Sequence, residues 1–187
     1  MKSRSFTAAT LAGALSISAS GAATAGSDPD RYVGGASELM MQACGAFLTG
    51  KPMAPVLSAL EAWPAHEPLR QRLLGDSKGA VFLTRQFGYG LYALTFEPQG
   101  QCSVEVFDVP TGLARARFAA LSAEFSGLLP ASRQTLRRAN SPPLEFALAP
   151  TDAAPGLQLR LRLTEDAPGR GSASFLLRRT SAAPRSI

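Results

Sequence analysis

The chain has 187 residues, in which 19 Lys and Arg outnumber 14 Asp and Glu, and it contains two cysteines and one histidine. This length suits one domain with a sizeable core. The single histidine and the two widely spaced cysteines exclude a zinc cluster and a CxxC redox pair. We expect no metal and no cofactor, because neither common glycine-rich phosphate loop occurs in the sequence.

The first 25 residues predict a secretory signal peptide. Lys2 and Arg4 form a short basic region, an Ala-rich apolar run follows over 6–23, and residues 23–25 fit the small-x-small cleavage rule. An uncleaved N-terminal anchor is the alternative, which the Ser and Thr residues of the run disfavour. We therefore expect cleavage before Gly26 and a soluble periplasmic or secreted protein with no membrane span.

Loss of the signal peptide would leave 17 basic and 14 acidic residues, a net charge of only +3, because residues 1–25 carry two basic side chains and no acidic one. This small charge, together with export, argues against a nucleic-acid partner. The basic residues are 16 Arg and 3 Lys in the whole chain. Such a bias, with abundant Ala, Leu and Pro, is typical of a GC-rich bacterial genome.

Short helices are expected at the start of the mature chain. A polar lead-in over 26–35 precedes a helix over 37–48, in which Met40, Cys44 and Leu48 recur at helical spacing. Proline and glycine residues then bound the following elements. These are a helix over 52–63, a helix over 67–74 and a strand over 80–86.

Residues 89–108 predict a β-hairpin around a type I turn at 97–100, which has Pro second and Gly fourth. The turn and the alternation of apolar residues give the same register. Its expected pairs are Glu97 with Gln101, Phe96 with Cys102, Leu94 with Val104, and Tyr92 with Val106.

Cys44 and Cys102 are expected to form a disulfide, because an even cysteine count in an exported chain favours pairing. A lipoprotein motif ending at Cys44 is the competing interpretation. Gln42 does not fit that motif, and Cys44 lies far beyond the apolar run of the signal peptide. We interpret the pair as a structural cross-link.

An amphipathic helix and several strands are expected after the hairpin. Thr111 is the predicted N-cap of a helix over 111–126, whose apolar residues recur every three or four positions. Further elements are strands over 133–139, 144–148, 157–164 and 172–179, a loop over 165–171 and a disordered tail over 181–187. We predict one α+β domain over 26–180: short N-terminal helices, an antiparallel sheet built from two strand groups, and the intervening helix packed on one face with the other helices.

Few residues indicate catalysis. The Gly-Asp-Ser sequence at 75–77 resembles the start of one esterase family, which implies a histidine nearer the C-terminus, whereas the only histidine, His66, lies upstream. His66 with Ser77, or a carboxylate pair brought together by folding, supports the alternative hypothesis of a small secreted hydrolase. The adjacent acids Glu165 and Asp166 fall in the predicted loop. We expect no catalytic residue.

Three arginines of the last strands are the candidate binding residues. Leucines at alternate positions over 157–163 place Arg160 and Arg162 on the opposite strand face, and Arg178 would join them if it faces the same way. Three guanidinium groups without a neighbouring acid in the sequence suit an anionic protein, a lipid headgroup or a wall polymer. The alternative is that they only keep the sheet face soluble.

The order of signal peptide, helix cysteine and the Gly-x-Cys-x-Val strand at 100–104 resembles that of small exported proteins of Gram-negative bacteria. The resemblance implies a compartment and no activity. We therefore expect a small exported binding or accessory protein without catalytic activity.

Overall fold

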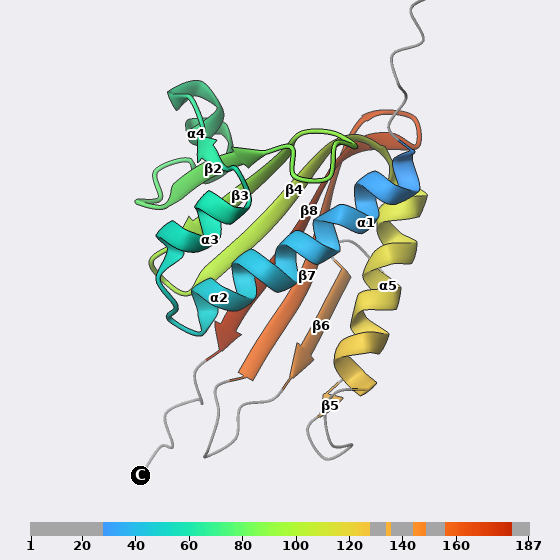
Figure 1. Cartoon of the computed structure of the whole chain (residues 1–187). Helices are drawn as coiled ribbons and strands as arrows, with labels where there is room; N and C mark the ends of the chain where they lie inside the picture. Colours follow the sequence, from blue (N-terminus) through green and yellow to red (C-terminus); the bar gives the residue numbers. More distant parts are fainter. Residues whose placement is uncertain (1–27, 128–133, 136–143, 149–155, 181–187) are drawn as a thin grey trace, which may run out of the picture.

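The computed structural model describes residues 28–127, 134–135, 144–148 and 156–180 (Figure 1). The predicted signal peptide over 1–25, most of the predicted strand over 133–139 and the predicted tail over 181–187 lie outside these residues. Within the described part of the chain, no helix is long and apolar enough to cross a membrane.

The fold is α+β, with one antiparallel sheet of eight strands in the order β1-β2-β3-β4-β8-β7-β6-β5. The helical segments are α1 (Pro29–Leu39), the π-helical turn η1 (Met40–Cys44), α2 (Gly45–Leu48), α3 (Met53–Ala59), α4 (Glu67–Leu74) and α5 (Thr111–Gly127). The strands are β1 (Trp63–Pro64), β2 (Ala80–Thr84), β3 (Tyr92–Glu97), β4 (Gln101–Pro110), β5 (Gln134–Thr135), β6 (Leu144–Leu148), β7 (Gly156–Ala167) and β8 (Arg170–Thr180). Strand β8 joins the two strand groups, because it lies between β4 and β7.

Strands β3 and β4 form the predicted hairpin. Phe96 lies opposite Cys102, and the other three predicted pairs are also observed. The Gly100 N–H donates to the Glu97 carbonyl at 3.0 Å, and Gly100 has a φ of 75°. Glycine adopts that conformation without the steric cost that a Cβ adds, so the turn holds the two strands in this register.

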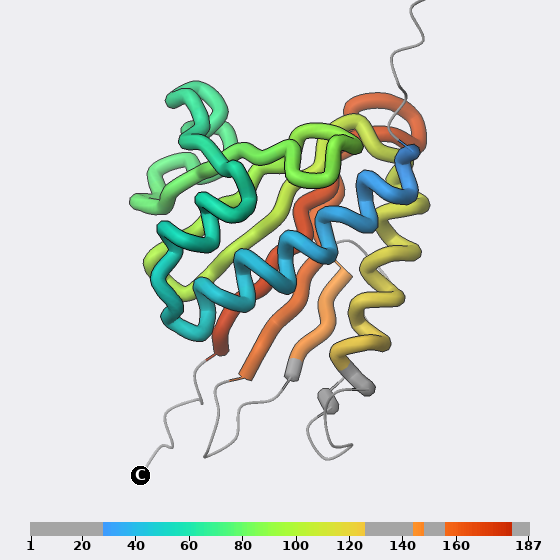
Figure 2. The backbone as a smooth tube through the Cα atoms, viewed as in Figure 1, coloured from blue at the N-terminus to red at the C-terminus, as the bar shows by residue number. Residues whose placement is uncertain are grey.

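One face of the sheet, here called the inner face, carries the main core. The continuous helical segment α1–η1–α2 crosses this face, and α5 lies beside α1 (Figure 1, Figure 2). Alternation along each strand sends one set of side chains to this face. Its fully buried members include Tyr92, Leu94, Val104, Phe146, Leu159, Leu161 and Phe175.

Helix α1 begins at Pro29, so the prediction of a non-helical lead-in over 26–35 is wrong. The Asp28 carboxylate accepts a hydrogen bond from the Asp30 N–H at 3.1 Å, and Pro29 takes the first helical position, where its missing N–H costs nothing. Two central glycines lower the helix propensity of this segment. Packing of α1 against strand β4 and helix α5 outweighs that loss.

Helix α4 lies on the opposite, outer face of the sheet, which corrects the prediction that all helices share one face. Leu69 and Leu73 of α4 pack with Val81 and Leu83 of β2, which are buried. Phe82, between those two residues, faces the inner core. Strand β2 is therefore apolar on both faces, and each face needs a cover.

Two further boundaries differ from the sequence predictions. The predicted loop over 165–171 is mostly strand, since β7 and β8 continue to a tight turn with a register shift between Glu165 and Ala167. Pairing between the ends of these two consecutive strands satisfies backbone groups that a loop would otherwise expose to water. The predicted helix over 52–63 is shorter, and Trp63 pairs in β1 instead.

Cys44 and Cys102 are joined as predicted, with their sulfur atoms 1.95 Å apart and their Cα atoms 5.4 Å apart. Both residues are fully buried. Cys44 ends η1 and Cys102 lies in β4. The cross-link therefore ties the inner-face helical segment to a central strand of the sheet.

Candidate functional site

A polar groove of about 280 Å³ lies on the outer face of the sheet. Helix α4 forms one wall, and the residues of β3, β4, β8 and β7 that point away from the core form the floor and the other wall. Its lining residues are Arg72, Leu73, Thr95, Glu97, Gln101, Ser103, Glu105, Arg162, Thr164, Asp166, Ser172, Ser174 and Leu176. The main helices cover the inner face. Among the described elements, α4 is therefore the one helix that packs on the face where these side chains lie.

The floor of the groove carries serine and threonine hydroxyl groups. Thr95 and Ser103 lie directly opposite each other in β3 and β4, and their hydroxyl oxygens are 2.5 Å apart. Both side chains are buried. Ser174 and Ser172 of β8 extend this surface. Such hydroxyl groups both donate and accept hydrogen bonds, so the floor suits a polar ligand group of either kind.

Glu105 is the half-buried acid of the groove. Burial raises the pKa of its carboxyl above the ordinary value, and the positive charges of Arg72 and Arg162 oppose that rise. The two arginines come from elements far apart in sequence, helix α4 and strand β7. They therefore flank Glu105 from both walls of the groove.

Glu97 closes the β3 end of the groove. The Ser77 hydroxyl donates to its carboxylate at 2.9 Å, and the Gln101 side chain donates to the other carboxylate oxygen. These bonds hold the carboxylate against the hairpin turn. The Glu97 carboxylate thus accepts hydrogen bonds from neighbouring side chains, whereas the Glu105 carboxylate accepts none from the described residues.

The three predicted binding arginines lie on this outer face. Arg162 pairs with Ser174, Arg160 with Leu176 and Arg178 with Gln158 across the β7–β8 ladder. Residues that face each other in a ladder project to the same side. The condition that Arg178 faces the same way as Arg160 and Arg162 is therefore met.

Arg160 has an acidic neighbour that the local sequence does not show. Glu145 of β6 lies opposite Arg160, and its carboxylate accepts a hydrogen bond from the Arg160 guanidinium at 2.9 Å. The Gln158 side chain donates to the same carboxylate at 2.5 Å. Arg162 and Arg178 are exposed and form no ion pair with any residue that the structure describes.

The residues of the hydrolase alternative do not converge. His66 is exposed and precedes α4, and the Ser77 hydroxyl is bonded to Glu97. Asp166 lines the groove, whereas the Glu165 carboxylate accepts a hydrogen bond from the Thr111 hydroxyl at 3.3 Å. The described residues contain no group of three or more His, Cys, Asp or Glu side chains that could hold a metal ion.

Of the three charged residues that meet in the groove, sequence reasoning proposed Arg162 and missed Arg72 and Glu105. Arg72 lies in a helix whose sheet face could not be assigned from periodicity. Glu105 is one of several polar residues that alternate with the apolar residues of β4. No local pattern distinguishes it, because its burial depends on α4 and β7. Comparison with protein-family models, curated proteins and solved structures found no match for this chain.

Proposed function

We propose that this protein is an exported binding or accessory protein, without catalytic activity, whose outer sheet face binds an anionic group of a partner in the cell envelope. One observation carries the proposal. Arg162 and Arg178 project from the polar face of the sheet, exposed and without an ion pair to any described residue.

The chemistry of these side chains favours carboxylate or phosphate. A guanidinium group offers a planar set of donors that matches either anion bidentately. Arg160 lies between Arg162 and Arg178 on the face, and Glu145 holds its guanidinium in place. The patch therefore presents two exposed guanidinium groups without an ion pair to a described residue, one on each side of the Arg160–Glu145 pair, and Arg162 also flanks the half-buried Glu105.

The scaffold supports binding without large rearrangement. The arginines lie on β7 and β8, which form the longest ladder of the sheet, and the disulfide fixes the neighbouring strand β4 to the helical layer. A rigid scaffold lowers the entropy lost when a partner is bound. The disulfide and the predicted signal peptide together support an oxidising, extracytoplasmic compartment.

The test is a double charge reversal, Arg162→Glu with Arg178→Glu, compared with Arg85→Glu with Arg115→Glu as a control of equal charge away from the groove. Each protein is used as bait in periplasmic extract at low and moderate salt, and the captured partners are identified by mass spectrometry. We expect wild type to capture partners at low salt and to release them at moderate salt. The outer-face variant should not capture these partners even at low salt.

The control pair separates local recognition from net charge. It should retain the partners of the wild-type protein. If the outer-face variant keeps the same partners with the same salt sensitivity, the arginines serve only the solubility of the face and the proposal is wrong.

A further inference from the structure

A second hollow, here called the strand-end hollow, lies where helix α4, the start of α1 and the ends of β3 and β4 meet. Its volume is about 710 Å³, within the range of sites that hold small organic molecules. The groove and the strand-end hollow share one lining residue, Arg72. The lining residues are Pro29, Tyr32, Leu69, Arg72, Gly90, Leu91, Phe107, Asp108 and Arg170.

Apolar side chains make up part of the wall of the strand-end hollow, and Tyr32 satisfies the nearby backbone. Its hydroxyl donates to the Leu91 carbonyl and accepts a hydrogen bond from the Phe107 N–H at 3.2 Å. Leu69, Leu91 and Phe107 are only partly buried. The hollow thus offers apolar side chains to a ligand without leaving these backbone groups unpaired.

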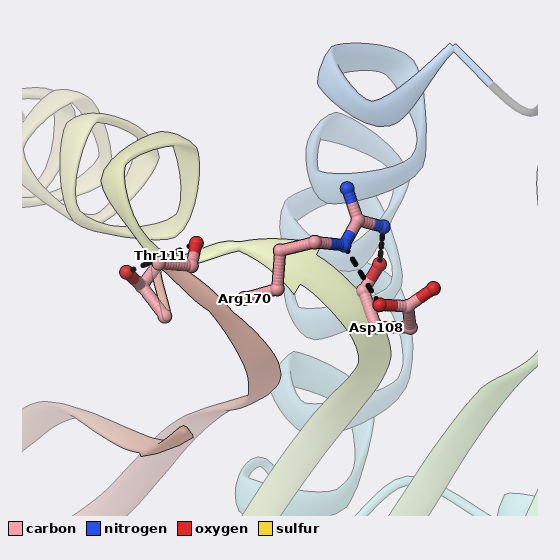
Figure 3. A network of polar contacts seen from close by, with 4 residues as sticks. Asp108, Thr111 and Arg170 are labelled. Carbon is pink, nitrogen blue, oxygen red and sulfur yellow. Dashed lines mark hydrogen bonds and ion pairs between the residues drawn. The ribbon is translucent and has the colours of Figure 1, made fainter. Parts of the chain in front are cut away.

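Arg170 and Asp108, two of the lining residues, form an ion pair with each other (Figure 3). The Arg170 Nε donates to the Asp108 carboxylate at 2.9 Å, and its Nη2 donates to the Asp108 backbone carbonyl at 2.6 Å. Asp108 lies at the register shift in β4 and has a φ of 51°. Arg170 holds this bulge in place, and its hydrogen bond and its charge lower the pKa of the Asp108 carboxyl.

Arg72 contributes to the strand-end hollow a positive charge that is not part of an ion pair among the described residues. Its guanidinium lies 5.4 Å from the centre of the Phe107 ring, a cation–π contact, and it forms no ion pair with a described residue. Arg72 and Arg170 face one acid, Asp108, so the lining carries one excess positive charge. The positive charge of Arg72 also acts on the half-buried Glu105 of the adjoining groove, with which it forms no ion pair. An apolar wall beside this unpaired guanidinium complements an apolar molecule with a single negative charge.

We propose that the strand-end hollow binds a small amphipathic carboxylic acid. The apolar body of the ligand contacts Leu69, Leu91 and Phe107, and its carboxylate pairs with the Arg72 guanidinium. This site is separate from the anionic partner surface of Arg162 and Arg178, and neither proposal requires the other.

Binding is measured as displacement of the fluorescent anion 8-anilinonaphthalene-1-sulfonate from the full mature protein by decanoate. Methyl decanoate, which has the same chain and no charge, is the matched ligand. For Arg72→Gln we expect decanoate to bind about tenfold more weakly, because one charge-assisted contact is lost, and methyl decanoate to bind as it does to wild type.

Two further variants locate the site. Leu69→Trp, which places a larger side chain in the hollow, should weaken both ligands, whereas Arg85→Gln, at an exposed position outside the hollow, should bind both as wild type does. Circular dichroism and Tm confirm that each variant is folded, and if Leu69→Trp is not, Arg72→Gln decides alone. Equal binding of decanoate by Arg72→Gln and wild type overturns the proposal, as does an equal loss in Arg85→Gln.

Discussion

Gly35 of helix α1 lies directly against the side chain of Tyr92 in strand β3. A Cβ at Gly35 would come within 2.3 Å of the Tyr92 hydroxyl oxygen and 2.7 Å of the Phe87 ring. The Tyr92 hydroxyl also donates to the Tyr32 carbonyl at 3.0 Å. This close approach seats α1 on the inner face, and no larger residue at position 35 preserves it.

We therefore expect Gly35→Ala to destabilise the fold by about 1–3 kcal/mol, the usual cost of overpacking. Gly34→Ala is the matched control, because a Cβ at Gly34 meets no atom within 4 Å. That control should stabilise the protein by about 0.5–1 kcal/mol through helix propensity. Urea unfolding of both variants measures the difference, and equal effects would show that α1 does not pack as described.

The disulfide is the second target. Intact-mass measurement with alkylation should find no free thiol at Cys44 or Cys102 before reduction. Replacing both by alanine should lower the unfolding free energy by about 4 kcal/mol, the chain-entropy value for a loop closed across 58 residues. Two thiols alkylated without reductant would contradict the assignment.

A substitution at Val104 tests the register of the hairpin. Val104 is fully buried on the inner face, so Val104→Asp places a carboxylate there without a partner, at a cost of several kcal/mol. We expect no cooperative unfolding transition by circular dichroism. Thr164→Asp, at an exposed strand position, is the control and should fold. A folded Val104→Asp protein would mean that the register is wrong.

Glu105 should make stability depend on pH. Burial raises the pKa of its carboxyl above the ordinary value of 4.5, so the folded state holds this proton more tightly than the unfolded state does. The stabilising contribution is present below pH 4.5 and is lost as the pH rises through the raised pKa.

The matched comparison is Glu105→Gln, which keeps the shape of the side chain and cannot ionise. Relative to wild type, this variant should gain unfolding free energy as the pH rises from 4 to 7, measured by urea denaturation at each pH. A difference that stays constant, or that changes in favour of wild type, would show that Arg72 and Arg162 compensate fully for the burial of the carboxylate.

Local patterns were sufficient for the hairpin and for helix α5. The turn at 97–100 and the alternation of its flanking strands lie within one continuous stretch, from Tyr92 to Val106, so one register satisfies both. Helix α5 spans Thr111–Gly127, close to the predicted 111–126, with Thr111 as its first residue. The start of α1 was missed because Gly34 and Gly35 disfavour a helix in isolation. The need for a glycine at position 35 arises from its contact with Tyr92, which is distant in the sequence.

The amino-acid sequence by itself determined the α+β class, the disulfide pair and the face on which Arg160 and Arg162 lie, because these follow from short-range periodicity and from a choice among only two cysteines. The tertiary structure alone decided which charges remain available. Glu145 neutralises Arg160 from a neighbouring strand, and Arg72 reaches both the groove and the strand-end hollow from a helix on the outer face. Electrostatic pairing and burial depend on distances between segments far apart in the chain, which periodicity along one segment does not encode.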